Sequence, residues 1–262
     1  MKDKDTDMRF YQHEYAEFYY KQQLEAGYPG KLLPFIMDEL KGSNSIIDIG
    51  AGTGFFTIPL AEAGHKVTSI EPSLEMINIM KRNSSQEVLS SVNICQSRWE
   101  NWRGEFHDAA IAVHSLYPMT DIKETLNLIN ISASKKIIIV RDPVRMKTIS
   151  KIVREKFGIF TSMDMNEDIT LFLDKNLIKY SVVNIYEERK HFIRNILQEA
   201  DSILYQLKLS ESKKEEPRAE SRGTQREEGK REAVAEIIKG ELVSSSSGDF
   251  FNTIYSDNAY VF

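Results

Sequence analysis

The sequence predicts an α/β protein with an open, mostly parallel, doubly wound sheet, a helical N-terminal cap and C-terminal helical additions. Short apolar segments alternate with amphipathic helical segments through the middle of the chain. A glycine-rich turn follows the first apolar segment, and acid-proline pairs end the second and the fifth, at Glu71-Pro72 and Asp142-Pro143. Apolar strands that alternate with helices are typical of parallel sheets covered on both faces.

Composition and charge narrow the class of protein. The chain has 262 residues, and its 34 basic and 39 acidic residues give a formal charge of −5. This acidic balance argues against a nucleic-acid binder, which needs a cationic surface. A single cysteine, Cys95, excludes a disulfide framework within the chain and a cysteine-cluster zinc site, and we expect no metal. Without an apolar run of 18 residues or a signal-like N-terminus, we expect a cytoplasmic protein with no membrane segment.

Residues 1–42 are expected to form an N-terminal helical cap or lid. The aromatic side chains between Phe10 and Tyr20 are spaced like one helical face, and glycine and proline at residues 27–30 end that helix. A second helix is expected over residues 32–40. The aromatic helix fits two roles equally well: a lid over a bound ligand, or a helix packed on the edge of the sheet.

Residues 43–142 are expected to form the α/β core that binds a ligand. We expect strands over residues 45–48, 66–70, 92–95, 109–113 and 137–140. Helices are expected over residues 55–63 and 73–82 and around residues 122–129.

Residues 143–262 are expected to complete the sheet and to add helices. Helices are predicted over residues 144–156, 167–176, 191–207 and 233–242, and strands over residues 180–187 and 250–262, the last as two short strands or one bulged strand. Residues 211–232 hold seven acidic and seven basic side chains in 22 positions. Such a segment buries too little apolar surface to offset its ordering entropy, so a flexible charged segment or a solvated helix is expected.

The segment most informative about chemistry is Asp48-Ile49-Gly50-Ala51-Gly52-Thr53-Gly54, between the first strand and its helix. Its glycines allow a tight turn and a close approach of the backbone to a ligand. Glu71 ends the next strand, where a carboxylate can accept two hydrogen bonds from a ribose diol. Dinucleotide binders use G-x-G-x-x-G, but here the third glycine comes one position early, which disfavours a nicotinamide-dependent oxidoreductase.

An acidic residue before G-x-G-x-G, with another ending the second strand, resembles the class I S-adenosylmethionine-dependent methyltransferases of Rossmann-like fold. The segments DIGAGTG and IEPSLEMI carry this resemblance, which covers roughly residues 43–142. It implies S-adenosylmethionine as cofactor and S-adenosylhomocysteine as product. It also implies an enzyme that transfers a methyl group to an O, N or C atom of a small-molecule acceptor, with no nucleic-acid partner.

The resemblance also implies where the cofactor binds. Asp48 is expected to orient the loop or to bind the cofactor ammonium group, and Glu71 to hold the ribose hydroxyls. Further cofactor contacts are expected at Gly50, Ala51, Gly52 and Gly54 in the turn, Pro72, Ser73 and Met76 near the adenosine, Arg98 and Trp99 at the adenine edge, and His114. Met76 and Trp99 fit ordinary core packing as well. Residues 96–100 place no aspartate near the expected adenine amine, unlike the family pattern.

The sequence names no catalytic residue, and His114 and Tyr117 are the candidates. Both follow the fourth strand, where ligands bind in open α/β sheets, and both fit a structural role as well. Methyl transfer from a sulfonium needs a base only when the acceptor arrives protonated. Two further hypotheses stay open: a protein or RNA methyltransferase, and a catalytically inactive protein that binds S-adenosylmethionine.

Overall fold

The computed structural model describes residues 8–158, 165–212 and 223–262. The chain divides into two compact units. The larger unit comprises Met1–Val144, Asp164–Glu187 and Ser256–Phe262, and the smaller comprises Arg145–Met163 and Glu188–Tyr255. The predicted cap therefore shares a unit with the predicted α/β core, and residues 143–262 contribute to both units.

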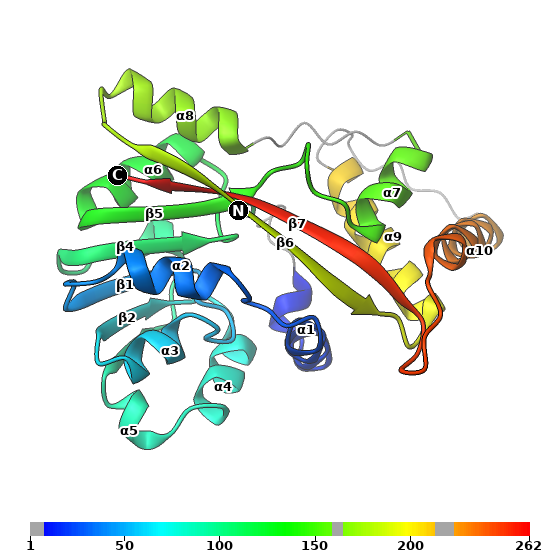
Figure 1. Ribbon diagram of the computed structural model, residues 1–262, viewed down its shortest axis with the longest axis horizontal. Helices are drawn as coiled ribbons and strands as arrows, with labels where there is room; N and C mark the ends of the chain where they lie inside the picture. The colour runs from blue at the N-terminus through cyan, green and yellow to red at the C-terminus, as the bar shows by residue number, and fades with distance from the viewer. Residues whose placement is uncertain (1–7, 159–164, 213–222) are drawn as a thin grey trace. The chain divides into compact units, whose positions relative to one another are not determined.

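The described strands form one open sheet of seven strands (Figure 1). Its strands are β1 (Ser45–Ile49), β2 (Lys66–Ile70), β3 (Val92–Cys95), β4 (His107–Val113), β5 (Ala133–Arg141), β6 (Ser181–Phe192) and β7 (Phe250–Val261). The strand order is β3-β2-β1-β4-β5-β7-β6, with β1 to β5 parallel and β7 antiparallel to β5. The predicted fold class is confirmed, and the C-terminal segment forms one long strand.

The helices alternate with the strands, as predicted. They are η1 (Met8–Tyr11), α1 (His13–Glu25), α2 (Leu32–Glu39), α3 (Thr57–Glu62), α4 (Leu74–Arg82), α5 (Gln86–Leu89), η2 (Trp99–Asn101), α6 (Ile122–Ser132), α7 (Ile149–Lys156), α8 (Met165–Lys175), α9 (Ile196–Ser212) and α10 (Gly223–Glu241). The short helices α5 and η2 were not predicted, because a single turn carries no apolar periodicity.

Several boundaries in the C-terminal half differ from the prediction: α7 begins at Ile149 although a helix was expected from residue 144, and α9 ends at Ser212 rather than at residue 207. Strand β6 continues to Phe192, so α9 begins only at Ile196, although a helix was expected from residue 191. Helix α10 begins at Gly223, so residues 223–232 of the segment expected to be flexible or a solvated helix are helical. Residues 213–222 of that segment lie outside the described residues.

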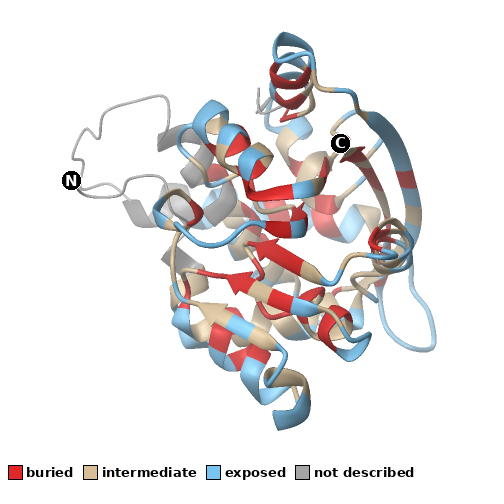
Figure 2. Ribbon diagram, turned by 90° about the vertical axis from the view of Figure 1, so that its left-hand side faces the viewer, coloured by how far each residue is buried: buried red, intermediate tan, exposed pale blue. Residues whose placement is uncertain are grey.

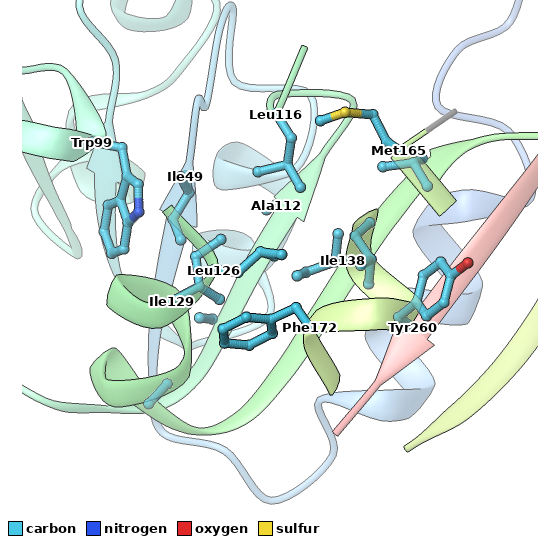
Figure 3. Close-up of a cluster of buried hydrophobic side chains, with 14 of the residues drawn as sticks. Ile49, Trp99, Ala112, Leu116, Leu126, Ile129, Ile138, Met165, Phe172 and Tyr260 are labelled. Carbon is cyan, nitrogen blue, oxygen red and sulfur yellow. The ribbon is translucent and has the colours of Figure 1, made fainter. Parts of the chain in front are cut away.

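Two apolar clusters cover the two faces of the sheet, because alternate residues of a strand point to opposite faces. In β5, Ile138 and Val140 belong to the first cluster, which α6 and α8 cover, while Ile137 and Ile139 belong to the second, which α2 and α3 cover. Figure 3 shows part of the first cluster. The central strands are buried along most of their length (Figure 2). This burial leaves the strand ends as places for polar, functional side chains.

The smaller unit has an apolar core of its own. Helices α7, α9 and α10 contribute Val153, Ile203 and Ile238, and β7 contributes Phe251. An ion pair between Arg231 and Asp201 links α10 to α9, with 2.7 Å between nitrogen and oxygen. No helix in the described part of the chain is long and apolar enough to cross a bilayer.

Candidate functional site

The glycine-rich turn connects β1 to α3 at the carboxyl end of the sheet. Gly50, Gly52 and Gly54 have φ angles of +74°, +56° and +86°, which favour glycine over residues with a side chain. The backbone N–H groups of Gly50 and Ala51 donate to the carbonyl oxygen of Ile70, at 2.9 and 3.1 Å. The turn is therefore tied to the end of β2, next to the acidic residue that follows it.

The three glycines of the turn differ in what surrounds them. A Cβ atom added to Gly50 would lie 2.4 Å from Cβ of Ser115, and one added to Gly54 would lie 2.6 Å from Cγ of Met80. A Cβ atom added to Gly52 would meet nothing within 4 Å. Gly50 and Gly54 are therefore needed for packing, whereas Gly52 borders open space where a ligand can approach the backbone.

Asp48 lies inside the protein and acts on the turn. Its side chain accepts a 2.6 Å hydrogen bond from the hydroxyl of Thr57 in α3, and the residue is 2% exposed. Burial raises the pKa of the Asp48 carboxyl to about 6, against the opposing effect of the hydrogen bonds from Thr57. Asp48 was expected either to orient the loop or to bind the cofactor ammonium group. Its hydrogen bond with Thr57 agrees with the first role, orienting the loop.

Glu71 joins the end of β2 to the turn. Its Oε2 atom accepts from the N–H of Gly52 at 2.8 Å, and its Oε1 atom accepts from the N–H of Ser73 at 2.9 Å. Burial raises the pKa of Glu71 to about 7, and the nearby Asp48 adds to this rise, while the two N–H donors oppose it. The predicted ribose-binding carboxylate thus lies directly against the glycine that borders open space.

Ser73 and Met76 contact the N-terminal segment. The Ser73 hydroxyl donates to the carbonyl oxygen of Phe10 at 2.6 Å and accepts from the N–H of Met76 at 3.3 Å, which caps α4. Met76 is buried in a cluster with Ala16 of α1 and Ile79 of α4. Its side chain therefore serves the packing of α1 on α4.

Helix α1 packs against α4 rather than against an edge strand. A hydrogen bond between His13 and Glu75 at 2.9 Å and an ion pair between Glu17 and Arg82 at 2.5 Å support this contact. The chain then returns toward the sheet through Tyr28. Its ring lies 5.0 Å from that of Phe55, 5.8 Å from that of Phe56 and 6.3 Å from that of His114, between centroids.

The residues after β3 divide between core and loop. Trp99 is 3% exposed, stacks on Trp102 with 5.2 Å between ring centroids, and donates from Nε1 to the carbonyl oxygen of Thr125 at 3.4 Å. It belongs to the first apolar cluster, as Figure 3 shows, so its side chain packs in the core. Arg98 is half-buried and precedes η2, and Pro72 is half-buried between Glu71 and Ser73.

His114 and Tyr117 lie at the carboxyl end of β4, as predicted. His114 has a φ angle of +55°, and its Nε2 atom lies 3.1 Å from Oδ1 of Asp257. The hydroxyl of Tyr117 accepts from the backbone N–H of Arg141 at 2.7 Å. The Arg141 guanidinium pairs with Asp257 at 3.0 Å.

Sequence reasoning missed Tyr28, Arg141 and Asp257. Asp257 lies 116 positions after Arg141, and only the antiparallel pairing of β7 with β5 brings the two together. An acid-proline pair follows Arg141 in the sequence, but no local pattern marks Asp257 as part of the site.

Two buried hydroxyl groups beside the glycine-rich turn show that the residues of the turn fit a polar ligand. The Oγ1 atom of Thr53 and the Oγ atom of Ser115 make no hydrogen bond within the described residues. Buried polar atoms are normally hydrogen-bonded, so a ligand with polar groups at the turn would complete these two. Together with the open side of Gly52 and the carboxylate of Glu71, they fit a ligand that carries a ribose and a polar tail.

Comparisons with known proteins agree with this geometry. Residues 40–201 match the family described as a methyltransferase domain. No protein with a curated description matches the sequence.

The fold is similar to those of solved structures at low sequence identity. A putative methyltransferase from an antibiotic biosynthesis pathway of Anabaena variabilis is 14% identical, with a TM-score of 0.54 over 87% of this chain and 96% of that chain. A putative S-adenosylmethionine-dependent methyltransferase from Methanococcus maripaludis is 19% identical, with a TM-score of 0.53 over 66% of this chain and 88% of that chain. YcgJ from Bacillus subtilis is 11% identical, with a TM-score of 0.52 over 87% of this chain and 97% of that chain.

These likenesses show the fold, and the family match covers more than half of the chain. The acidic residues, the glycine turn and the unsatisfied hydroxyls fit the cofactor of that family. The chain belongs to the methyltransferase domain family and is an S-adenosylmethionine-dependent methyltransferase with a Rossmann-like fold.

Proposed function

We propose that the methyl acceptor is a small molecule, bound under the N-terminal segment at the carboxyl ends of β1 and β4. The observation that carries this proposal is the packing of Tyr28 against Phe55, Phe56 and His114. Ligands of open α/β sheets bind outside the carboxyl ends of the strands, and Tyr28 lies across that position.

The segment around Tyr28 is also held from its other side. Lys31 donates from Nζ to the carbonyl oxygen of Tyr186 at 3.0 Å, and its backbone N–H donates to Oε2 of Glu187 at 3.1 Å. A segment tied down at α4 and at β6 narrows the approach to the strand ends. A polymer needs an open surface, and RNA needs a cationic one, whereas this chain carries a net charge of −5.

Each group of residues has its own part in methyl transfer. The cofactor supplies an activated methyl group on a sulfonium, with a neutral leaving group. Glu71 and the turn at Gly52 would hold the ribose and the amino-acid portion, so that the methyl group points to the acceptor. Tyr28, Phe55 and Phe56 would exclude water and offer ring faces to a cationic sulfonium or acceptor.

The experiment that tests this proposal follows a labelled methyl group into competing acceptors. The purified protein is incubated with S-adenosylmethionine carrying a radioactive methyl group and with a panel of phenols, alcohols, amines and carbon acids, with total RNA, or with unfolded cell protein. We expect label in a low-mass product. Label that enters RNA or protein faster than every small molecule, with a steep salt dependence for RNA, would contradict the proposal.

The variant Tyr28→Ala provides a second arm, with Tyr180→Ala as its control. Tyr180 is another partly buried tyrosine of the same unit, and it packs on Tyr260, away from the turn. We expect Tyr28→Ala to raise KM for the small acceptor about tenfold or more, which is the effect of losing one well-packed aromatic contact. The control is expected to keep KM within about twofold, because its ring contacts no residue of the site. Binding of S-adenosylhomocysteine without turnover on any acceptor would favour an inactive binding protein instead.

A further inference from the structure

Thr53 and Ser115 carry hydroxyl groups whose oxygens are buried and make no hydrogen bond within the described residues. Thr53 is 2% exposed and follows Gly52, where an added Cβ atom would meet nothing within 4 Å. A buried hydroxyl group without a partner has lost its hydrogen bonds to water and gained none in return, which costs free energy. Two such groups beside one turn therefore indicate a polar ligand that supplies the missing partners.

Ser115 reaches the turn from the end of β4. The backbone N–H of His114 donates to the carbonyl oxygen of Ile139 at 2.9 Å, and the φ angle of His114, +55°, then ends the regular strand. Ser115 comes next, and its Cβ and Oγ atoms lie 2.4 and 3.3 Å from the position that a Cβ atom on Gly50 would take. The hydroxyl group of Ser115 thus lies against the backbone of the turn because residue 50 has no side chain.

The strand order places Ser115 and Glu71 on opposite sides of the turn. The turn follows β1, which pairs with β2 on one side and with β4 on the other. Glu71 follows β2 and is the predicted ribose contact, and the adenine is expected at the residues that follow β3. In the order β3-β2-β1-β4, a cofactor with its adenine and ribose at β3 and β2 has its amino-acid tail at β1 and β4. Thr53 and Ser115 lie on this tail side.

The carboxylate of the tail needs hydrogen-bond donors, and much of the turn's backbone is already engaged. Four of its N–H groups donate to oxygen atoms of the protein, and they belong to Gly50, Ala51, Gly52 and Gly54. The hydroxyl groups of Thr53 and Ser115 are donors that these hydrogen bonds leave unused. A carboxylate has lone pairs enough to accept from both.

We propose that the hydroxyl groups of Thr53 and Ser115 hold the carboxylate of the cofactor's amino-acid tail. Hydrogen bonds to a charged acceptor are stronger than those between neutral groups, so two hydroxyl donors can fix the tail. A fixed tail limits how the sulfonium can turn, which favours one orientation of the methyl group. The inference concerns the cofactor alone and goes beyond the proposed function, because it does not depend on the acceptor.

Calorimetric titration with three ligands tests which group the hydroxyls hold. S-adenosylhomocysteine carries the whole tail, its decarboxylated form lacks only the carboxylate, and 5′-methylthioadenosine lacks both charged groups. We expect Thr53→Val and Ser115→Ala each to weaken the binding of S-adenosylhomocysteine about tenfold or more, the effect of losing one hydrogen bond to a charged group. We expect the other two ligands to bind each variant within about twofold of the wild type.

Thermal unfolding of the ligand-free variants separates a binding role from a structural one. Valine has nearly the shape of threonine, and Thr53→Val removes a hydroxyl group that has no partner, so the Tm of the ligand-free protein is expected to stay or to rise. The increase in Tm that S-adenosylhomocysteine gives is expected to be smaller than in the wild type. A lower Tm without ligand, together with an unchanged affinity, would mean a structural role and would overturn the proposal.

The matched control is Thr125→Val. Thr125 is fully buried, and its Oγ1 atom also makes no hydrogen bond in the part of the chain that the structure describes. It lies in α6, however, where its carbonyl oxygen accepts from Nε1 of Trp99. We expect this variant to keep the wild-type ratio of the affinities for S-adenosylhomocysteine and 5′-methylthioadenosine.

Three results of the titrations would overturn the assignment. The first is an affinity for S-adenosylhomocysteine that stays unchanged in both Thr53→Val and Ser115→Ala. The second is an equal loss for S-adenosylhomocysteine and its decarboxylated form, which would assign the hydroxyl groups to the ammonium group instead. The third is an equal loss for all three ligands, which would mean that the substitutions distort the turn. No methyl acceptor enters the test, so its outcome is independent of that for the proposed function.

Discussion

We expect Glu71 to make the affinity for the cofactor depend on pH. Burial raises its pKa to about 7, so at pH 8 about nine-tenths of the molecules carry the carboxylate and at pH 6 only about one-tenth do. The carboxylate can accept two hydrogen bonds from a ribose diol in addition to those from Gly52 and Ser73, whereas the protonated acid places a donor there. If only the ionised form binds, the affinity at pH 6 is about tenfold weaker than at pH 8.

The size of this change distinguishes a buried carboxyl group from an exposed one. A carboxyl group with the ordinary pKa of 4.5 stays almost fully ionised between pH 6 and pH 8, so the affinity would change by only a few per cent. Asp48 has a pKa of about 6 and is therefore about half ionised at pH 6, which can change the affinity by about twofold at most. A tenfold loss between pH 8 and pH 6 therefore reports chiefly on Glu71.

Calorimetric titration with two ligands measures the effect. S-adenosylhomocysteine is the first, and 5′-methylthioadenosine is the second, because it keeps the ribose and lacks the titratable amino-acid tail. We expect the same pH dependence for both ligands. In Glu71→Gln we expect weaker binding at pH 8 and almost no pH dependence. A wild-type affinity that stays flat from pH 6 to pH 8, or a Glu71→Gln variant that keeps the slope, would refute the reasoning.

Three further predictions concern stability and packing. The pKa of Glu71 is raised in the folded state, so its contribution to stability is present below pH 4.5 and is lost as pH rises to about 7. We expect urea unfolding to show that, over this range, the free energy of unfolding falls by about 3 kcal/mol more in the wild type than in Glu71→Gln. Gly50→Ala should lower the free energy of unfolding by several kcal/mol, because the added Cβ would meet Ser115. Gly52→Ala should lower it by only about 1–2 kcal/mol, because of the φ angle, but should weaken cofactor binding. Thermal melts with and without S-adenosylhomocysteine would measure both effects. Trp99→Ala should lower the free energy of unfolding by about 3–5 kcal/mol, because the side chain is buried in the core. The folded fraction should bind S-adenosylhomocysteine with the affinity of the wild type. A large loss of affinity would instead show that Trp99 contacts the cofactor.

The local pattern of the sequence was sufficient for the core of the fold. The strands β2 and β3 begin and end at the predicted residues, because each is a short apolar run bounded by turn residues. Asp48, the glycine turn and Glu71 also meet as expected, since consecutive parallel strands end at the same edge of a sheet. In these elements the physical causes act within a few residues, so they can be read from neighbouring positions.

The sequence did not distinguish cofactor contacts from core packing at Met76 and Trp99. Both positions have the apolar character that either environment requires. The structure places Met76 in the cluster between α1 and α4 and Trp99 in the cluster that α6 covers, and a contact of either residue with the cofactor stays a prediction. The alternation of apolar residues predicted a strand at the C-terminus, but not that it would enter the sheet beside β5.

The sequence by itself determined the class of fold and, through the resemblance of its motifs, the methyltransferase family, and it predicted where the cofactor binds. The tertiary structure alone decided which residues surround the end of β4: Tyr28 from the N-terminal segment, Arg141 from β5 and Asp257 from β7. A turn or a strand depends on interactions between neighbours, whereas a charge cluster assembled from three strands depends on the register of pairings more than 100 residues apart. Such a register follows from the packing of the whole sheet, and no single segment of the sequence specifies it.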